Sequence, residues 1–158
     1  MIKTILFDFS RVILNTRDDS YAGSLNSLHS KLSGSDSYNF FDHYVLNDEL
    51  LDHARTLRAK YQLVIFTTGA IQDVPEVRGI IDPIFEKIYT VHEIGLPKEG
   101  KEAYEFIFND LNKRPEEVLF IDDQEANVKA AFQAGSQTIR YESNEQLFSA
   151  LPALLGKG

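Results

Sequence analysis

Short apolar runs alternate with helix-like segments along this chain, and that alternation restricts its fold more than any other feature. A short apolar run is typical of a buried strand, whereas apolar residues three and four positions apart are typical of a helix. Strands that alternate with helices predict an α/β fold, in which a doubly wound parallel sheet carries helices on both faces. The predicted strands are Thr4–Phe7, Gln62–Phe66, Lys87–Val91, Val118–Ile121 and Thr138–Tyr141.

Helical spacing appears between these runs, and cap residues indicate where the helices begin and end. One predicted helix follows Asn47, a residue suited to cap its first turn, and carries Leu50, Leu51, Ala54 and Leu57 on one face. The other predicted apolar faces are Val77, Ile80 and Ile81, with Asp73 as the cap; Tyr104, Ile107 and Leu111; and Val128, Ala131 and Phe132. Gly135 is expected to end the last of these in a left-handed conformation. A final helix is expected to begin at Ser143, with Gln146 in the capping-box position, and to be limited by Pro152.

Residues 13–46 interrupt the alternation. This segment has leucines at helical spacing, then the polar break Gly34–Ser37, then an aromatic cluster of Tyr38, Phe40, Phe41 and Tyr44. It is too short to fold alone, so we expect a small helical cap or flap. The chain is then a single domain, with residues 1–12 and 47–158 as its core and residues 13–46 as the insert.

Composition limits the class of protein. The 158 residues suffice for one domain with a good core. A net charge of −8 argues against nucleic acid or an anionic membrane as a partner, and the absence of cysteine excludes disulfides and thiolate chemistry. The first apolar run is too short for a signal-peptide core, and no window approaches the roughly 18 apolar residues of a membrane span. We expect a cytoplasmic protein.

Polar residues follow successive predicted strands: Asp8, Thr67, Lys98 and the pair Asp122-Asp123. Because the carboxyl ends of strands in one sheet meet at one edge, these side chains are expected to share a crevice. Three carboxylates there would repel one another by about 4 kcal/mol per close pair, and a divalent cation such as magnesium would relieve the repulsion. A carboxylate nucleophile, a metal, a lysine and a hydroxyl suit phosphoryl transfer.

The ordered motifs resemble those of the haloacid dehalogenase (HAD)-like hydrolases. They are Asp8-Phe9-Ser10-Arg11-Val12, Thr67, Lys98, and Phe120-Ile121-Asp122-Asp123 with Asn127, and the resemblance extends from residue 3 to about residue 141. It implies a Rossmann-like core and a magnesium-dependent phosphatase. Asp8 would be the nucleophile that forms an aspartyl-phosphate.

The resemblance also assigns the remaining site residues. Thr67 and Lys98 would hold the phosphoryl oxygens, with Thr68 competing with Thr67 for this role and Gly69 beside them. The magnesium ligands would be Asp8, the backbone carbonyl of Ser10, Asp122 and Asp123, and Asn127 would support them. The expected substrate is a small phosphate ester or a larger phosphorylated molecule, since a small cap leaves the crevice open; the oligomeric state is left open.

The first motif departs from the family pattern at Ser10 and Arg11. The family usually has aspartate at position 10, which protonates the leaving group and then activates water. Serine does neither well, and the loss of a general acid–base typically costs roughly 10²–10⁴-fold in rate. Alkyl phosphates should therefore react poorly, and aryl or acyl phosphates better. Arg11, where glycine is usual, places a cation that either binds phosphate or points to solvent.

Other functions stay open beside the phosphatase. Ser10 and Arg11 favour a degenerate domain that binds phosphate or a partner protein, whereas the retained Asp8 and Lys98 argue against it. The dehalogenase branch lacks the late acidic pair, and the phosphonate-cleaving branch needs an amine from a larger cap, where this insert offers only Lys31. In a receiver domain the acidic pair comes first in the chain, so chain order excludes it.

Overall fold

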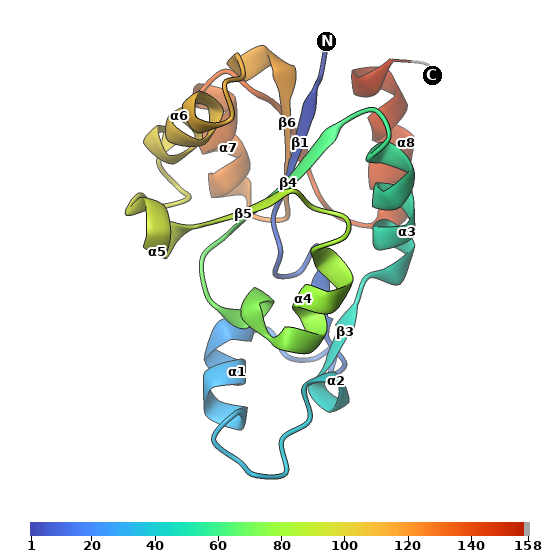
Figure 1. Ribbon diagram of the computed structural model, residues 1–158, viewed down its shortest axis with the longest axis vertical. Coiled ribbons are helices and arrows are strands. Elements are labelled where there is room, and N and C mark those ends of the chain that lie inside the picture. The colour runs from blue at the N-terminus through green and yellow to red at the C-terminus, as the bar shows by residue number, and fades with distance from the viewer. Residues whose placement is uncertain (157–158) are drawn as a thin grey trace.

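The computed structural model describes residues 1–156 and has a parallel sheet at its centre (Figure 1). Within those residues the sheet has five strands in the order β5-β4-β1-β6-β7. They are β1 (Thr4–Phe7), β4 (Gln62–Thr67), β5 (Lys87–Thr90), β6 (Val118–Asp122) and β7 (Gln137–Arg140). The doubly wound α/β fold is confirmed, and each strand lies within one residue of its predicted bounds.

Helices cover both faces of the sheet because both faces of its strands are apolar (Figure 1). One face packs against α3 (Asp48–Leu57), α4 (Pro75–Ile81) and α8 (Asn144–Leu155). The other packs against α6 (Lys101–Asp110) and α7 (Glu125–Gln133). Successive strand residues alternate between the two cores, so that Ile5 and Phe7 face the first and Leu6 the second.

Several helix boundaries follow the sequence signals. The Asn47 side chain accepts a hydrogen bond from the Leu50 amide, as predicted for the cap of α3. Gly135 follows α7 with a φ of 98°, and Ser143 caps α8 by accepting from the Gln146 amide. The Gln146 side chain accepts from the Glu142 amide rather than from that of Ser143, so the capping box is only half formed.

Three helix predictions were wrong. Asp73 does not cap α4: it ends the 3-10 turn η1 (Ile71–Asp73), and Val74 precedes Pro75 at the first position of the helix, where a missing amide costs little. Pro152 lies inside α8, because burial of Leu147 and Leu151 outweighs the hydrogen bond that proline removes. Phe132 is 67% exposed, since the inner face of α7 consists of Asn127, Ala130 and Ala131, of which only Ala131 was predicted.

The insert lies below the carboxyl edge of the sheet (Figure 1). It contains α1 (Leu25–Leu32), where the spacing of the leucines indicated a helix. It also contains the short α2 (Phe40–His43) and an antiparallel pair, β2 (Leu14–Thr16) and β3 (Tyr44–Leu46). The sequence does not predict this ribbon, because three residues are too few to display a strand period. Phe40 stacks on Tyr44 with ring centroids 4.6 Å apart, and the Tyr44 hydroxyl donates to the Leu25 carbonyl, which ties the ribbon to α1.

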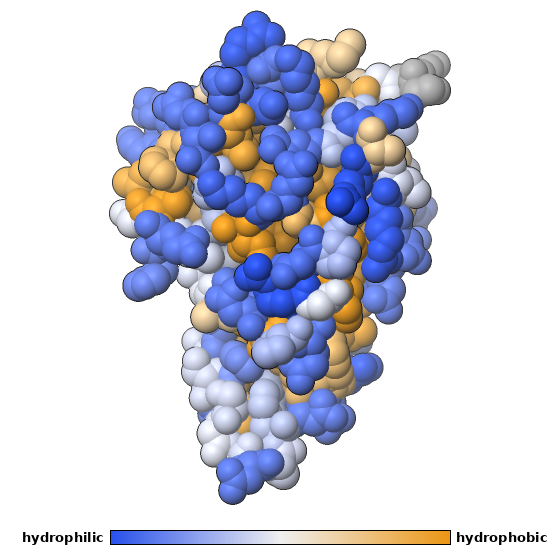
Figure 2. Space-filling model, viewed as in Figure 1, coloured by the Kyte–Doolittle hydropathy of each residue, from blue (hydrophilic) through white to orange (hydrophobic). Residues whose placement is uncertain are grey.

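Short elements complete the chain: α5 (Val91–Ile94) follows β5, and the 3-10 turn η2 (Pro115–Glu117) precedes β6. Polar and charged side chains cover most of the face shown in Figure 2, and apolar side chains gather beside α5 and near β4 and β5. Among residues 1–156, no helix has both the length and the apolar character to cross a bilayer.

Candidate active site

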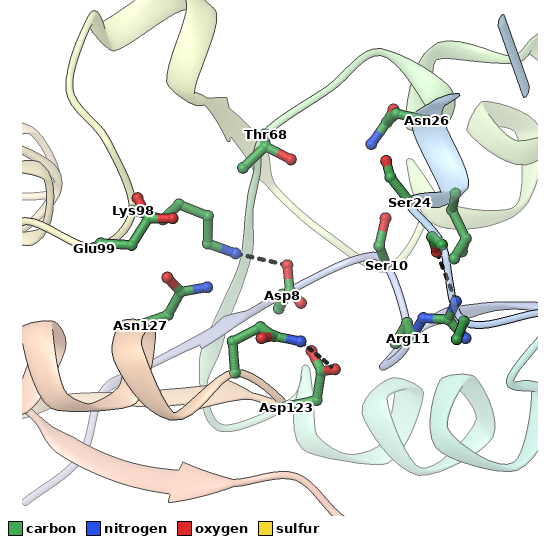
Figure 3. A pocket seen from close by; sticks show the side chains of 14 residues that line it. Asp8, Ser10, Arg11, Ser24, Asn26, Thr68, Lys98, Glu99, Asp123 and Asn127 are labelled. Atoms are coloured by element: carbon green, nitrogen blue, oxygen red, sulfur yellow. Dashed lines mark hydrogen bonds and ion pairs between the residues drawn. The ribbon is translucent and has the colours of Figure 1, made fainter. Parts of the chain in front are cut away.

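An open cavity of about 370 Å³ lies where the carboxyl ends of the central strands meet the insert (Figure 3). β1 pairs with β4 on one side and with β6 on the other, so Asp8 after β1 lies between the ends of both neighbours. The residues that line the cavity come from these strand ends, from the loop after α5, from the first turn of α7 and from the insert: Asp8, Ser10, Arg11, Ala22, Gly23, Ser24, Leu25, Asn26, Thr68, Lys98, Glu99, Asp123, Gln124 and Asn127.

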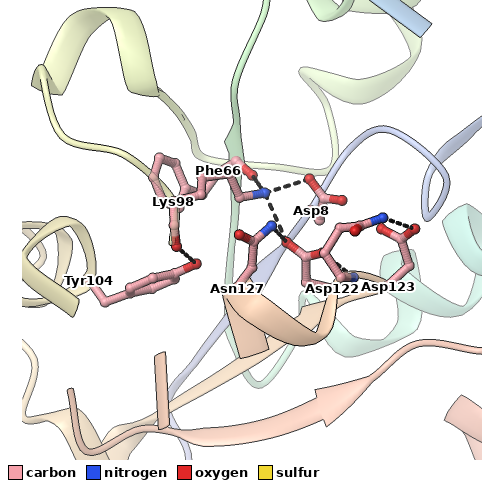
Figure 4. A network of polar contacts seen from close by, with 8 residues as sticks. Asp8, Phe66, Lys98, Tyr104, Asp122, Asp123 and Asn127 are labelled. Atoms are coloured by element: carbon pink, nitrogen blue, oxygen red, sulfur yellow. Dashed lines mark hydrogen bonds and ion pairs between the residues drawn. The ribbon is translucent and has the colours of Figure 1, made fainter. Parts of the chain in front are cut away.

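Lys98 is the centre of the polar network beneath the cavity (Figure 4). Its Nζ lies 2.6 Å from Asp8 Oδ1 and 2.9 Å from Asp122 Oδ2, and it donates to the Phe66 carbonyl at 2.9 Å. The Tyr104 hydroxyl holds the Lys98 carbonyl at 2.8 Å, which fixes the backbone from which the side chain extends. Lys98 is only 2% exposed, so its charge is compensated by protein carboxylates rather than by water.

The buried charges shift one another's ionisation. Burial raises the pKa of the Asp8 carboxyl to about 7; Lys98 opposes this shift and the Asp122 carboxylate adds to it. Burial alone would lower the pKa of the Lys98 ammonium, but the adjacent Asp8 and Asp122 more than offset that effect, and the pKa is raised. Burial, followed by the charge of Asp122, also raises the pKa of Asp123. The cluster therefore holds more negative charge than Lys98 balances.

Asp8, Asp122 and Asp123 each offer an oxygen within 4.8 Å of the others, a set that suits a small cation with hard oxygen ligands. Their surroundings differ. Asp123 lines the cavity, whereas Asp122 is fully buried and both its oxygens accept hydrogen bonds from the protein. Its Oδ1 accepts from the Gln124 amide at 2.8 Å, and its Oδ2 accepts from Asn127 Nδ2 at 3.0 Å as well as pairing with Lys98.

The two unusual residues of the first motif have different surroundings. Ser10 lines the cavity, and its buried Oγ has no hydrogen-bond partner within residues 1–156. Arg11 has a φ of 67°, a conformation that costs an L-residue roughly 1–2 kcal/mol and explains the family preference for glycine there. Its Nη2 donates to the carbonyls of Tyr21 and Gly23 at 2.9 and 2.8 Å. The guanidinium thus holds the insert while also lining the cavity.

The two threonines after β4 face different surroundings. Thr67, which the resemblance assigns to phosphate binding, is 1% exposed and is not among the cavity-lining residues, whereas Thr68 is exposed and lines the cavity. Gly69 leaves room for the insert, because a Cβ there would lie 2.1 Å from Asn26 Oδ1. This geometry favours Thr68 as the side chain that meets a ligand.

Sequence reasoning missed the insert's share of the cavity. Ser24 and Asn26 line it, and Asn26 Oδ1 accepts from the backbone amides of Ala70 and Ile71 at 3.1 Å each. No motif marks a lone asparagine or serine in the insert. Glu99 and Gln124 were also missed, although each directly follows a residue that was identified.

Comparison with known proteins agrees with the fold. A family model for haloacid dehalogenase-like hydrolases matches residues 35–135, which is more than half of the chain. The chain therefore belongs to the HAD-like hydrolases.

Solved structures share its fold. A predicted HAD-like family hydrolase from Porphyromonas gingivalis aligns over 100% of both chains with a TM-score of 0.70 and 23% identity. A HAD family enzyme from Bacteroides thetaiotaomicron, solved as an aspartate-to-alanine mutant in complex with magnesium and inorganic phosphate, has a TM-score of 0.65 and 19% identity over 94% of this chain and 99% of its own. A HAD-superfamily hydrolase from Geobacter sulfurreducens has a TM-score of 0.67 and 15% identity, covering 90% of this chain and 88% of its own.

Proposed function

We propose that this hydrolase is a magnesium-dependent phosphatase that works through an aspartyl-phosphate on Asp8, with general acid–base catalysis weakened by Ser10. The observation that carries the proposal is the position of Lys98 Nζ, which lies within 2.9 Å of both Asp8 and Asp122 beside an open cavity. A buried lysine between two carboxylates is expensive to maintain for stability alone. Magnesium and phosphate bound to the related Bacteroides thetaiotaomicron enzyme support the same conclusion.

The residues present fit magnesium. Asp8 and Asp123 face the cavity, and the Ser10 carbonyl would complete a set of hard oxygen ligands. Asp122 holds Lys98 and Asn127 through Oδ2, whereas its Oδ1 accepts one hydrogen bond, from the Gln124 amide, and keeps a lone pair that could join the set. A bound cation would neutralise the excess negative charge of the cluster and the charge of a phosphate ester.

Asp8 supplies the nucleophilic oxygen. Lys98 holds Oδ1, and the other carboxylate oxygen attacks phosphorus as the bond to the leaving-group oxygen breaks. Water then attacks the phosphorus of the aspartyl-phosphate, which releases inorganic phosphate and regenerates Asp8. We infer that the hydroxyl of Thr68 binds a phosphoryl oxygen during both steps, and that Lys98, whose three N–H donors go to Asp8, Asp122 and the Phe66 carbonyl, does so by exchanging one of these partners.

Ser10 limits both steps, because an alcohol neither donates nor accepts a proton readily near pH 7. A phenolate or carboxylate leaving group departs without a proton, so aryl and acyl phosphates should be the better substrates. A domain that binds phosphate without turnover is the alternative that Ser10 itself suggests.

Turnover of an aryl phosphate, with and without magnesium, tests the proposal. Replacing Asp8 with asparagine removes the nucleophile and should lower kcat by about 10³-fold or more. Binding of inorganic phosphate to both proteins, measured by calorimetry, separates the alternatives. Equal rates in wild type and Asp8→Asn would exclude the phosphatase, and phosphate binding without turnover would favour the binding domain.

A further inference from the structure

Asn26 joins the insert to the core and also faces the cavity. Its Oδ1 accepts from the backbone amides of Ala70 and Ile71, each at 3.1 Å, so the oxygen is fully used within the protein. Its Nδ2 has no protein acceptor among residues 1–156. In Figure 3 this nitrogen is directed toward the cavity, on the wall opposite Lys98. Because the two backbone bonds fix the amide, a free donor is held in one orientation.

The same wall carries a positive charge. Arg11 lines the cavity on the same side as Ser24 and Asn26, with Ser24 between the two in Figure 3, and its guanidinium bonds only to neutral backbone carbonyls, those of Tyr21 and Gly23. No carboxylate forms an ion pair with Arg11 among residues 1–156. Glu99, the acidic lining residue outside the carboxylate cluster, lies on the other side beside Lys98 (Figure 3). The insert side of the cavity therefore presents a donor and an uncompensated cation.

We propose that Asn26 is a specificity-determining residue that donates a hydrogen bond from Nδ2 to an acceptor oxygen on the leaving group. The charge of Arg11 selects a carboxylate as that acceptor over a neutral carbonyl. The preferred substrates are then phosphate esters or acyl phosphates whose leaving group bears a carboxylate. This inference rests on the proposed function, since it concerns the far side of the same substrate.

Two variants separate the two roles of Asn26. Asn26→Asp keeps an oxygen for the Ala70 and Ile71 amides but replaces the donor with a negative charge, whereas Asn26→Ala removes both. If Asn26 only positions the insert, Asn26→Asp should retain the substrate preference of the wild type. Asn109→Asp, at an exposed asparagine of α6, is the matched control for the added charge.

The test compares kcat/KM, kcat and KM for three aryl phosphates: phenyl phosphate, 3-acetylphenyl phosphate and 3-carboxyphenyl phosphate. The meta substituents add a neutral or a charged acceptor without greatly changing the acidity of the phenol. In wild type and Asn109→Asp we expect the carboxylated compound to be preferred over phenyl phosphate by about tenfold, chiefly through KM, as a charge-assisted hydrogen bond would give. The acetyl compound should lie between them.

In Asn26→Asp the preference for the carboxylated compound should vanish or reverse. A wild-type preference near unity, or one that Asn26→Asp leaves intact, would overturn the proposal. A preference for the acetyl compound over the carboxylated one would overturn the role given to Arg11. If no aryl phosphate is turned over, the phosphatase itself fails. The Asn26 contact is then tested by calorimetry, as the ratio of the dissociation constants of phenyl and 3-carboxyphenyl phosphate in the presence of magnesium. The same preference is expected in wild type and the same loss in Asn26→Asp.

Discussion

The two walls of the cavity are built differently. On the core wall, Asp8, Lys98, Asp122 and Asn127 are at most 8% exposed and bond side chain to side chain across strand ends. On the insert wall, Arg11 and Asn26 reach backbone carbonyls and amides. Side-chain pairs need specific partners, whereas backbone groups are present in any sequence. The core wall therefore depends on particular pairs of side chains. The insert wall tolerates substitution, because the insert is held through backbone groups.

This difference assigns the two walls to different tasks under the proposed function. Buried, mutually bonded charges are held in place before substrate arrives, which is what stabilisation of a transferring phosphoryl group requires. Polar groups at an exposed rim instead sort substrates by what their leaving groups carry. Substitutions on the core wall should lower the rate for every substrate, and those on the insert wall should change the order of substrates.

Lys98→Met gives the largest expected effect, because it removes the only cation within 3 Å of both Asp8 and Asp122 in the described part of the chain. We expect kcat on an aryl phosphate to fall about 10³-fold. The free energy of unfolding should fall by about 3–5 kcal/mol, since two buried carboxylates lose their partner. Steady-state kinetics measure kcat, and denaturant unfolding measures the free energy of unfolding.

Lys98→Arg is the matched variant, since it keeps the charge but not the shape. It should fold more stably than Lys98→Met and still lose most of the rate. Wild-type turnover in Lys98→Met would contradict the role given to the core wall.

Ser10→Asp should have the next largest effect and the opposite sign. A carboxylic acid beside the leaving group supplies the missing proton donor, so turnover of an alkyl phosphate should rise by about 10²-fold. Aryl phosphate turnover should change much less, because a phenolate needs no proton. Ser10→Asn is the control for side-chain size. A rise of the same factor for both substrates would show that proton transfer is not the limitation.

Glu117→Gln should have the smallest effect and leave both walls intact, because Glu117 lies at the amino end of β6. Its carboxylate accepts a hydrogen bond from Lys3 Nζ at 2.6 Å, from the Arg114 amide at 2.9 Å and from the Arg114 guanidinium at 3.2 Å. These contacts lower the pKa of Glu117 from 4.5 to about 2. A carboxyl with a lowered pKa contributes stability above its ordinary pKa and loses it as pH falls through the folded value.

The melting temperature of Glu117→Gln should therefore lie below that of wild type at pH 7. This gap in melting temperature should narrow as the pH falls from 4.5 to 2. The substrate order of the enzyme should not change. Glu116→Gln, at a neighbouring exposed residue, serves as the control and should show a smaller gap. A constant gap across this pH range would exclude ionised Glu117 as its cause.

Much of the fold is readable in the residues. The five apolar runs became the five strands of the sheet in residues 1–156, because a run buried on both faces tolerates little polarity. The predictions were wrong where a residue typical of a helix boundary was opposed by the burial of apolar residues near it. Asp73 and Pro152 have the chemistry of helix boundaries, but burial of neighbouring apolar residues placed the boundaries elsewhere. The β2–β3 ribbon was not predicted, because its three-residue strands are too short to show an alternation of polar and apolar residues.

The chain order of Asp8, Thr67, Lys98 and Asp122-Asp123 was enough to indicate the family and to bring these residues to one sheet edge, because parallel strands align their carboxyl ends. Local sequence did not indicate which side chains face the cavity. Thr68 and Asp123 line it, whereas Thr67 and Asp122 are buried. Nor did it show that Arg11 and Asn26 form the opposite wall. The place of Asn26 depends on how the insert packs against the loop after β4, a contact between segments more than 40 residues apart. That of Arg11 depends on its hydrogen bonds to the carbonyls of Tyr21 and Gly23. Contacts of this kind produce no periodic pattern in the segments that they join, so only the tertiary structure shows them.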